Sequence, residues 1–137
     1  MCIRDSGCVI FVKLWQFTPE DRTRVQLDTN FMQAVPHRDI ADVSIMPLYQ
    51  DEYEQVSIQH WAANSSVTIS ADGGLEVMVI DGSFIESNDT LESQSWIRLP
   101  VGAGLTATTG SEGAKVWVKQ NHLKHVGDQI QRVSGAN

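Results

Sequence analysis

A short sequence occurs twice in this chain of 137 residues, and the repeat constrains the fold more than any other feature. Gly7 to Leu14 reads GCVIFVKL and Gly113 to Gln120 reads GAKVWVKQ, so each copy runs from glycine through an apolar strand pattern to lysine. Similarity between distant segments is typical of repeated structural units. We expect each copy to be the last strand of such a unit, with one complete unit between them. A chance likeness between two apolar strands is the alternative.

Length and charge limit the class of protein. The hydrophobic content of 42% is enough for the core of one ordinary domain. The formal net charge of −7 and the scattered Lys and Arg argue against nucleic acid or an anionic membrane as a partner. No apolar run approaches the roughly 18 residues of a membrane span, and no secretory signal begins the chain. With only Cys2 and Cys8, the sequence predicts a soluble, cytoplasmic protein.

Runs rich in Val, Ile, Trp and Thr alternate with turn residues, a pattern typical of an all-β sandwich or barrel. The predicted strands are Val9 to Leu14, Val25 to Leu27, Val43 to Met46, Val56 to Trp61, Val67 to Ile69, Glu76 to Ile80, Ser95 to Leu99 and Ala114 to Lys119. Turns are predicted at Asp72-Gly73-Gly74, Asp81-Gly82, Ser87-Asn88-Asp89, Pro100-Val101-Gly102 and Glu112-Gly113. The strand count fits a jelly roll.

The chain divides into four expected segments. Residues 1–6 resemble a translated adapter remnant of metagenomic assemblies and are expected to be a non-native start. Residues 7–22 are expected to be the last strand of a preceding unit and a linker. Residues 23–123 are expected to form the complete unit, and residues 124–137 a polar, frayed tail.

The order of motifs in the second half resembles the cupin superfamily, and within it the ChrR-like cupins. The motifs are GGLEVMVIDGSF from Gly73, SWIRLPVGAGL from Ser95 and EGAKVWVK from Glu112. Many members of this group are double cupins whose first unit ends in a strand like GCVIFVK, followed by the segments read here at Pro19 to Arg22 and Val25 to Thr29. The resemblance covers nearly all of residues 7–123. It implies an all-β, cupin-type double-stranded β-helix, also called a jelly-roll barrel.

The same resemblance implies where a metal would bind. Cupins ordinarily hold Zn, Fe, Mn or Ni inside the barrel with three histidines and one glutamate. On this chain Glu76 takes the glutamate position, Ser70 and Asp72 take the first two histidine positions, and Leu105 takes the last. Such a set offers few donors to a transition metal. We therefore predict a degenerate pocket at these residues, with no metal, no other cofactor and no catalytic residue.

Histidine and tryptophan residues leave two alternatives open. His60 alternates with Val56 and Ile58 and could approach Glu76 as a fifth pocket residue, or it could be a hydrogen-bonded core histidine. His122 and His125 are expected in solvent. The four tryptophans either pack in the core or line a site for a small-molecule ligand.

The sequence supports three hypotheses of function. The favoured one is a non-catalytic scaffold or regulatory module, for which the resemblance to ChrR implies an anti-sigma context. The second is the inert half of a metal-dependent dioxygenase that acts on diketones or aryl ketones, as relatives of this group do. The third is a small-molecule binding module. Because Val9 to Leu14 would lack a barrel, we expect this strand to pair with its own sheet or across a homodimer.

Overall fold

The computed structural model of the chain describes residues 10–12 and 24–124. The expectations for the non-native start, the linker and nearly all of the tail concern residues outside these ranges. The same holds for both ends of the first repeat copy, of which only Ile10 to Val12 can be compared with the expectation.

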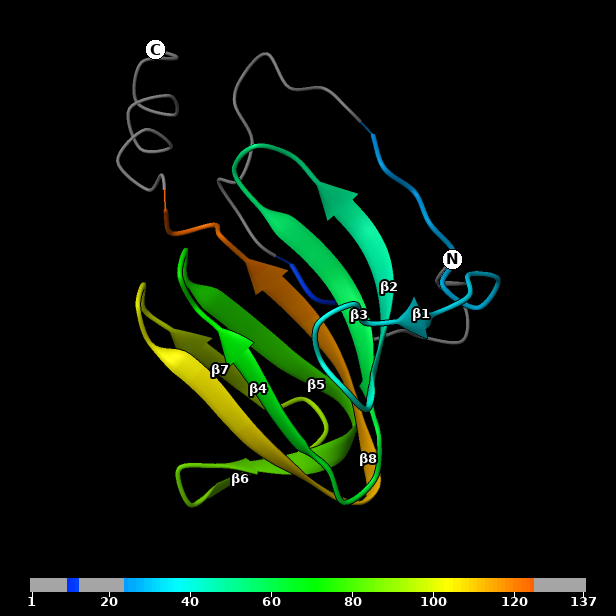
Figure 1. Ribbon diagram of the computed structural model, residues 1–137. Coiled ribbons are helices and arrows are strands. Elements are labelled where there is room, and N and C mark those ends of the chain that lie inside the picture. The colour runs from blue at the N-terminus through cyan, green and yellow to red at the C-terminus, as the bar shows by residue number, and fades with distance from the viewer. Residues whose placement is uncertain (1–9, 13–23, 125–137) are drawn as a thin grey trace.

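The described residues form an all-β structure without a helix, as the sequence predicts. Its strands are β1 (Val35–Pro36), β2 (Val43–Gln50), β3 (Gln55–Trp61), β4 (Ser66–Ser70), β5 (Leu75–Glu86), β6 (Asp89–Leu91), β7 (Trp96–Leu99) and β8 (Gly104–Gln120). All pairings are antiparallel, in the order β1-β2-β3-β8-β5-β6, and β4 and β7 join as further partners of β8 and β5 (Figure 1). No helix in these ranges could cross a membrane.

Strands β5 and β8 are long enough to take part in both halves of the barrel (Figure 1). The end of β8 pairs with β3 and with the start of β5, whereas the start of β8 pairs with β4 and with the end of β5. The register between β5 and β8 shifts around Gly82, where both strands bend. These two strands therefore connect the two halves of the sheet through one corner.

Alternate residues of these strands fill the interior. Leu75, Val77 and Val79 of β5 are completely buried, and so are Val116 and Val118 of β8. Val67, Ile69, Leu105 and Ala107 from β4 and the start of β8 belong to the same core cluster. Burial of each large apolar side chain contributes about 1.5 to 3 kcal/mol to stability. The core is therefore built from both halves of the sheet.

Several strand boundaries differ from the sequence prediction. Val25 to Leu27 is not a strand, while β1, β6 and the first half of β8 were not predicted. The turns predicted at Asp81-Gly82 and Glu112-Gly113 lie within β5 and β8, and the other three predicted turns are confirmed. A glycine with positive φ occurs in β-bulges as well as in turns, so the sequence does not distinguish a bulge within a strand from a turn between strands.

Gly82 and Gly113 meet where the two bent strands come closest. Their φ angles are 77° and 72°, in the left-handed region that favours glycine. A Cβ on Gly82 would collide with the carbonyl oxygen of Gly113, and a Cβ on Gly113 would collide with the carbonyl oxygen of Trp61. The bend therefore requires hydrogen in place of a side chain at both positions.

We predict that Gly113→Ala lowers the free energy of unfolding by more than about 2 kcal/mol, because it combines backbone strain with a collision. Gly102→Ala is the matched control: Gly102 has a φ of 86° but open space where its Cβ would lie. The control should lose only about 1 to 2 kcal/mol. Urea unfolding followed by tryptophan fluorescence measures both. Equal losses would contradict the close approach of the strands at this corner.

Candidate functional site

The structure does not bring the four predicted pocket residues together. Leu105 is completely buried in the barrel interior. Ser70 and Asp72 are exposed to solvent. Glu76 is buried, but it alternates with the interior residues of β5, so its side chain points to the outer face of the sheet. The described structure therefore places these side chains on different faces of the sheet and not around one pocket.

The interior positions lie one residue earlier in the sequence. Ile69, Ala71 and Leu75 are buried in the same core cluster as Leu105, and Ile69 is the direct strand partner of Leu105. Side chains alternate between the faces of a strand, so an error of one residue exchanges the two faces. All four interior side chains are hydrocarbon and carry no donor atom for a metal. The residues present therefore do not fit the metal that the cupin resemblance implies.

No other group of ligands compensates within the described part of the chain. In residues 10–12 and 24–124, no three His, Cys, Asp or Glu side chains lie close enough together to hold a metal ion.

Glu76 instead belongs to a buried polar cluster on the outer face of β5 and β8. The Trp96 indole N–H donates to Glu76 Oε1 at 3.0 Å, and His122 Nε2 lies 3.3 Å from Glu76 Oε2. Beside them Lys119 forms an ion pair with Glu54. Burial strengthens such contacts because solvent screens them less. The carboxylate is thus held by an indole and an imidazole.

His122 is buried, so the expectation that it lies in solvent is wrong. It follows β8 in a tight turn that begins at Asn121, whose φ is 70°. The backbone N–H of Leu123 donates to the carbonyl oxygen of Gly73 at 2.9 Å, which fixes this turn against the Asp72-Gly73-Gly74 turn. An asparagine directly after the strand was the one signal for this turn, because asparagine tolerates positive φ.

His60 does not approach Glu76. It lies on the outer face opposite Lys115 of β8, whereas Glu76 lies opposite Lys119, four residues further along the strand. The pKa of His60 is lowered from 6.5, first by partial burial and second by the nearby Lys115 charge. Both causes favour the neutral imidazole.

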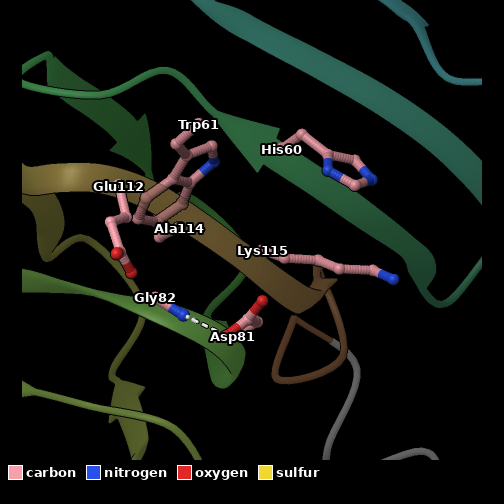
Figure 2. A pocket seen from close by; sticks show the side chains of 7 residues that line it. All are labelled: His60, Trp61, Asp81, Gly82, Glu112, Ala114 and Lys115. Carbon is pink, nitrogen blue, oxygen red and sulfur yellow. Dashed lines mark hydrogen bonds between the residues drawn. The ribbon is translucent and has the colours of Figure 1, made fainter.

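A polar recess surrounds His60 on the outside of the barrel. Its volume is about 240 Å³. Figure 2 shows its lining residues, which are His60, Trp61, Asp81, Gly82, Glu112, Ala114 and Lys115. The Asp81 carboxylate accepts a hydrogen bond from the Gly82 backbone N–H at 2.9 Å (Figure 2). With both charge signs and a neutral histidine at its edge, this recess can accept a small polar molecule.

The inner face of β3 carries polar residues that the sequence pattern does not predict. Gln59 and Ser57 are buried, and the Trp61 indole N–H donates to Gln59 Oε1 at 2.9 Å. The amide of Gln59 lies 3.5 Å from Ser57 Oγ. The alternation correctly predicts that Val56, Ile58 and His60 share one face of β3. That face is the outer one. The Trp61 indole reaches the interior.

Comparison with known proteins gives the fold. No family model matches the chain, and no curated protein matches it. Among solved structures it is similar to an RmlC-like cupin from Ralstonia eutropha, with a TM-score of 0.60 and 14% identity. That match covers 69% of this chain and 66% of the other, just under two thirds of its length.

Two further structures have informative names. A proposed acetylacetone dioxygenase from Methylibium petroleiphilum has a TM-score of 0.62 at 12% identity, over 76% of this chain and 81% of the other. The anti-sigma ChrR from Rhodobacter sphaeroides, solved in complex with SigE, has a TM-score of 0.59 at 9% identity, over 68% of this chain and 51% of the other. At these identities the likeness concerns the fold, and the expected cupin fold is confirmed.

We predict that Glu76→Gln lowers the free energy of unfolding by about 1 to 3 kcal/mol, because it removes the buried negative charge beside His122. The amide oxygen still accepts the indole hydrogen bond, so the loss reports the charge. Asp72→Asn is the control, and at an exposed position it should change stability by less than about 0.5 kcal/mol. Urea unfolding measures both. Two equally small effects would mean that the Glu76 carboxylate is solvated.

We also predict that NMR titration finds the pKa of His60 below 6.5, and that Lys115→Gln raises it only in part, since burial is the larger cause. Because the pKa of His60 is lowered in the folded state, the contribution of the neutral imidazole to stability is present above pH 6.5. It is lost as the pH falls through the folded-state pKa. If Lys115→Gln leaves the pKa of His60 unchanged, the lysine charge is not a cause of the shift.

Proposed function

We propose that this cupin unit works without a metal, as a non-catalytic scaffold or regulatory module. The observation that carries the proposal is the hydrocarbon character of the interior positions Ile69, Ala71, Leu75 and Leu105. A transition metal needs several nitrogen, sulfur or oxygen donors, and close-packed methyl groups supply none. These four side chains also carry no acid, base or nucleophile.

A regulatory role is supported by the likeness to ChrR, an anti-sigma protein of which this fold matches about half. In that role the barrel would hold a partner or a ligand on its outside, where the polar side chains lie. The recess at His60 is a candidate place for a small polar ligand. The acidic composition and the lone Cys2 and Cys8 support a cytoplasmic setting.

A second candidate is the inert half of a metal-dependent dioxygenase that cleaves diketones or aryl ketones. The likeness to the proposed acetylacetone dioxygenase favours it, since the two folds share most of their lengths. In this case the oxygen chemistry would belong to another cupin unit, and the described unit would still bind no metal. Both candidates therefore predict that Leu75 and its interior neighbours bind no metal.

The test is metal analysis of the purified chain after incubation with Fe, Zn, Mn and Ni and thorough dialysis. We expect no stoichiometric metal, because the interior positions Ile69, Ala71, Leu75 and Leu105 offer no donor atoms. A designed gain of binding makes the test sharper: ligands placed at the interior positions should create metal affinity. The variant carries Ile69→His, Ala71→His, Leu75→Glu and Leu105→His.

The matched control keeps Glu76 and places histidine at the positions first predicted from the sequence, with Ser70→His, Asp72→His and Leu105→His. Because these side chains do not converge, the control should gain no tight site. Circular dichroism confirms that each variant folds. One firmly retained metal ion per wild-type chain would by itself contradict the proposal.

A further inference from the structure

The two copies of the repeated sequence touch each other at equivalent positions. Aligning Gly7 with Gly113 places Phe11 at the position of Trp117. In the structure the ring centroids of Phe11 and Trp117 are 5.0 Å apart, with an angle of 58° between the planes. This tilted geometry is a favourable aromatic contact. A residue of the first copy therefore packs on its own counterpart in the second.

The neighbours of Phe11 repeat the pattern of inside and outside found on β8. Ile10 and Val12 align with Val116 and Val118, which are completely buried in the barrel. Phe11 faces the barrel, yet Ile10 and Val12 remain 70% and 65% exposed. Residues 10–12 thus contact this unit through Phe11, whose counterpart Trp117 lies on the outer face of β8. Their two would-be interior residues are left uncovered by the described part of the chain.

Contact between equivalent residues indicates a particular symmetry. In an interface with two-fold symmetry, a residue touches its own counterpart only close to the axis, and other contacts occur in reciprocal pairs. Two barrels that pack through the outer faces of their last strands fulfil this condition. A strand that merely adds to a sheet edge would place no such constraint on which residues meet.

We propose that the outer face of β3, β8 and β5 around Trp117 is the interface with a second cupin unit whose last strand contains Ile10, Phe11 and Val12. A pseudo-two-fold axis then passes between Phe11 and Trp117. Ile10 and Val12 lie inside the second barrel, as Val116 and Val118 lie inside the first.

The rest of this face has the character of an interface that is only partly covered. An apolar recess of about 340 Å³ remains beside the aromatic pair. It is lined by Phe11, Met78, Val79, Ile80, Ser93, Gln94 and Trp117. Ile80 and Trp96 are exposed there, and exposed apolar groups in one patch mark interaction surfaces. By the symmetry argument, the counterparts of Met78 and Ile80 in the second unit fill this recess.

The experiment completes the second barrel with a copy of this chain. Residues 24–112 are fused in front of Gly7, so that Gly7 to Leu14 follows them as Gly113 to Gln120 does in the chain itself. Val12→Cys, in a background with Cys2→Ser and Cys8→Ser, reports burial through the rate of its reaction with a thiol reagent. We expect this rate to fall at least about tenfold on fusion. Val101→Cys of the original unit, in an exposed loop, is the control and should keep its rate.

The substitutions Ile10→Asp and Val12→Asp test whether these two side chains lie inside a second barrel or only touch the surface of the first. In the 137-residue chain these changes should leave the melting temperature unchanged, because both side chains are exposed. In the fusion they should unfold the added unit and leave the original unit folded. An equal reaction rate of Val12→Cys in a folded fusion, or a large loss of stability in the unfused Asp variants, would overturn the proposal.

A swap keeps the proposal testable even if the added unit does not fold. Under a pseudo-two-fold relation the two aromatic positions are interchangeable, so Phe11→Trp with Trp117→Phe should keep the melting temperature of the unfused chain within about 2 °C. Phe11→Ser or Trp117→Ser alone should lower it by more. If the exchange lowers the melting temperature as much as Trp117→Ser does, the pseudo-two-fold relation is contradicted. A homodimer, seen by light scattering, that protects Val12→Cys in the unfused chain would also overturn the proposal, since the occupant would then be a second copy.

Discussion

The alternation of side chains along β5 decides what this barrel can do. Leu75 points into the core, and Glu76, one residue later, points to the outer face. The carboxylate is therefore held by Trp96 and His122 on the outside, and it cannot serve the interior. A change of one residue in this register would exchange the two faces and would place a charged group in the core. The close approach of the strands at Gly82 contributes to fixing that register.

The described residues form a barrel of cupin fold in which the charged side chains of Glu76 and Lys119 lie on the outer face. Its interior is closed by hydrocarbon at Ile69, Ala71, Leu75 and Leu105. The outer face of β3, β5 and β8 carries the buried ions, the recess at His60 and the aromatic contact of Trp117. The same fold in other proteins therefore does not transfer their activity to this one, because function depends on the side chains at the site. These two features, the hydrocarbon interior and the outer recess, are the basis of the proposed role as a scaffold or regulatory module.

Most of the fold could be predicted from the sequence, and the faces of its strands could not. Val, Ile and Trp runs predict six of the eight observed strands, although only the second half of β8, and turn residues predict three of their connections. The face of β5 stayed ambiguous because Met78 and Ile80 on the outside are as apolar as Val77 and Val79 on the inside. On β3 the ambiguity was greater still, since Gln59 is buried inside. Polar and apolar residues separate cleanly only when one face of a sheet meets water.

Nuclear Overhauser contacts between side chains test the register most directly. With Ile and Leu methyl groups labelled, we expect contacts that join Ile69 and Leu75 to Leu105, and separate contacts from Glu76 to the rings of Trp96 and His122. Contacts between Glu76 and the Leu105 methyl groups, with Leu75 seen near Trp96 instead, would contradict this register. That result would return the carboxylate to the interior and reopen the case for a metal there.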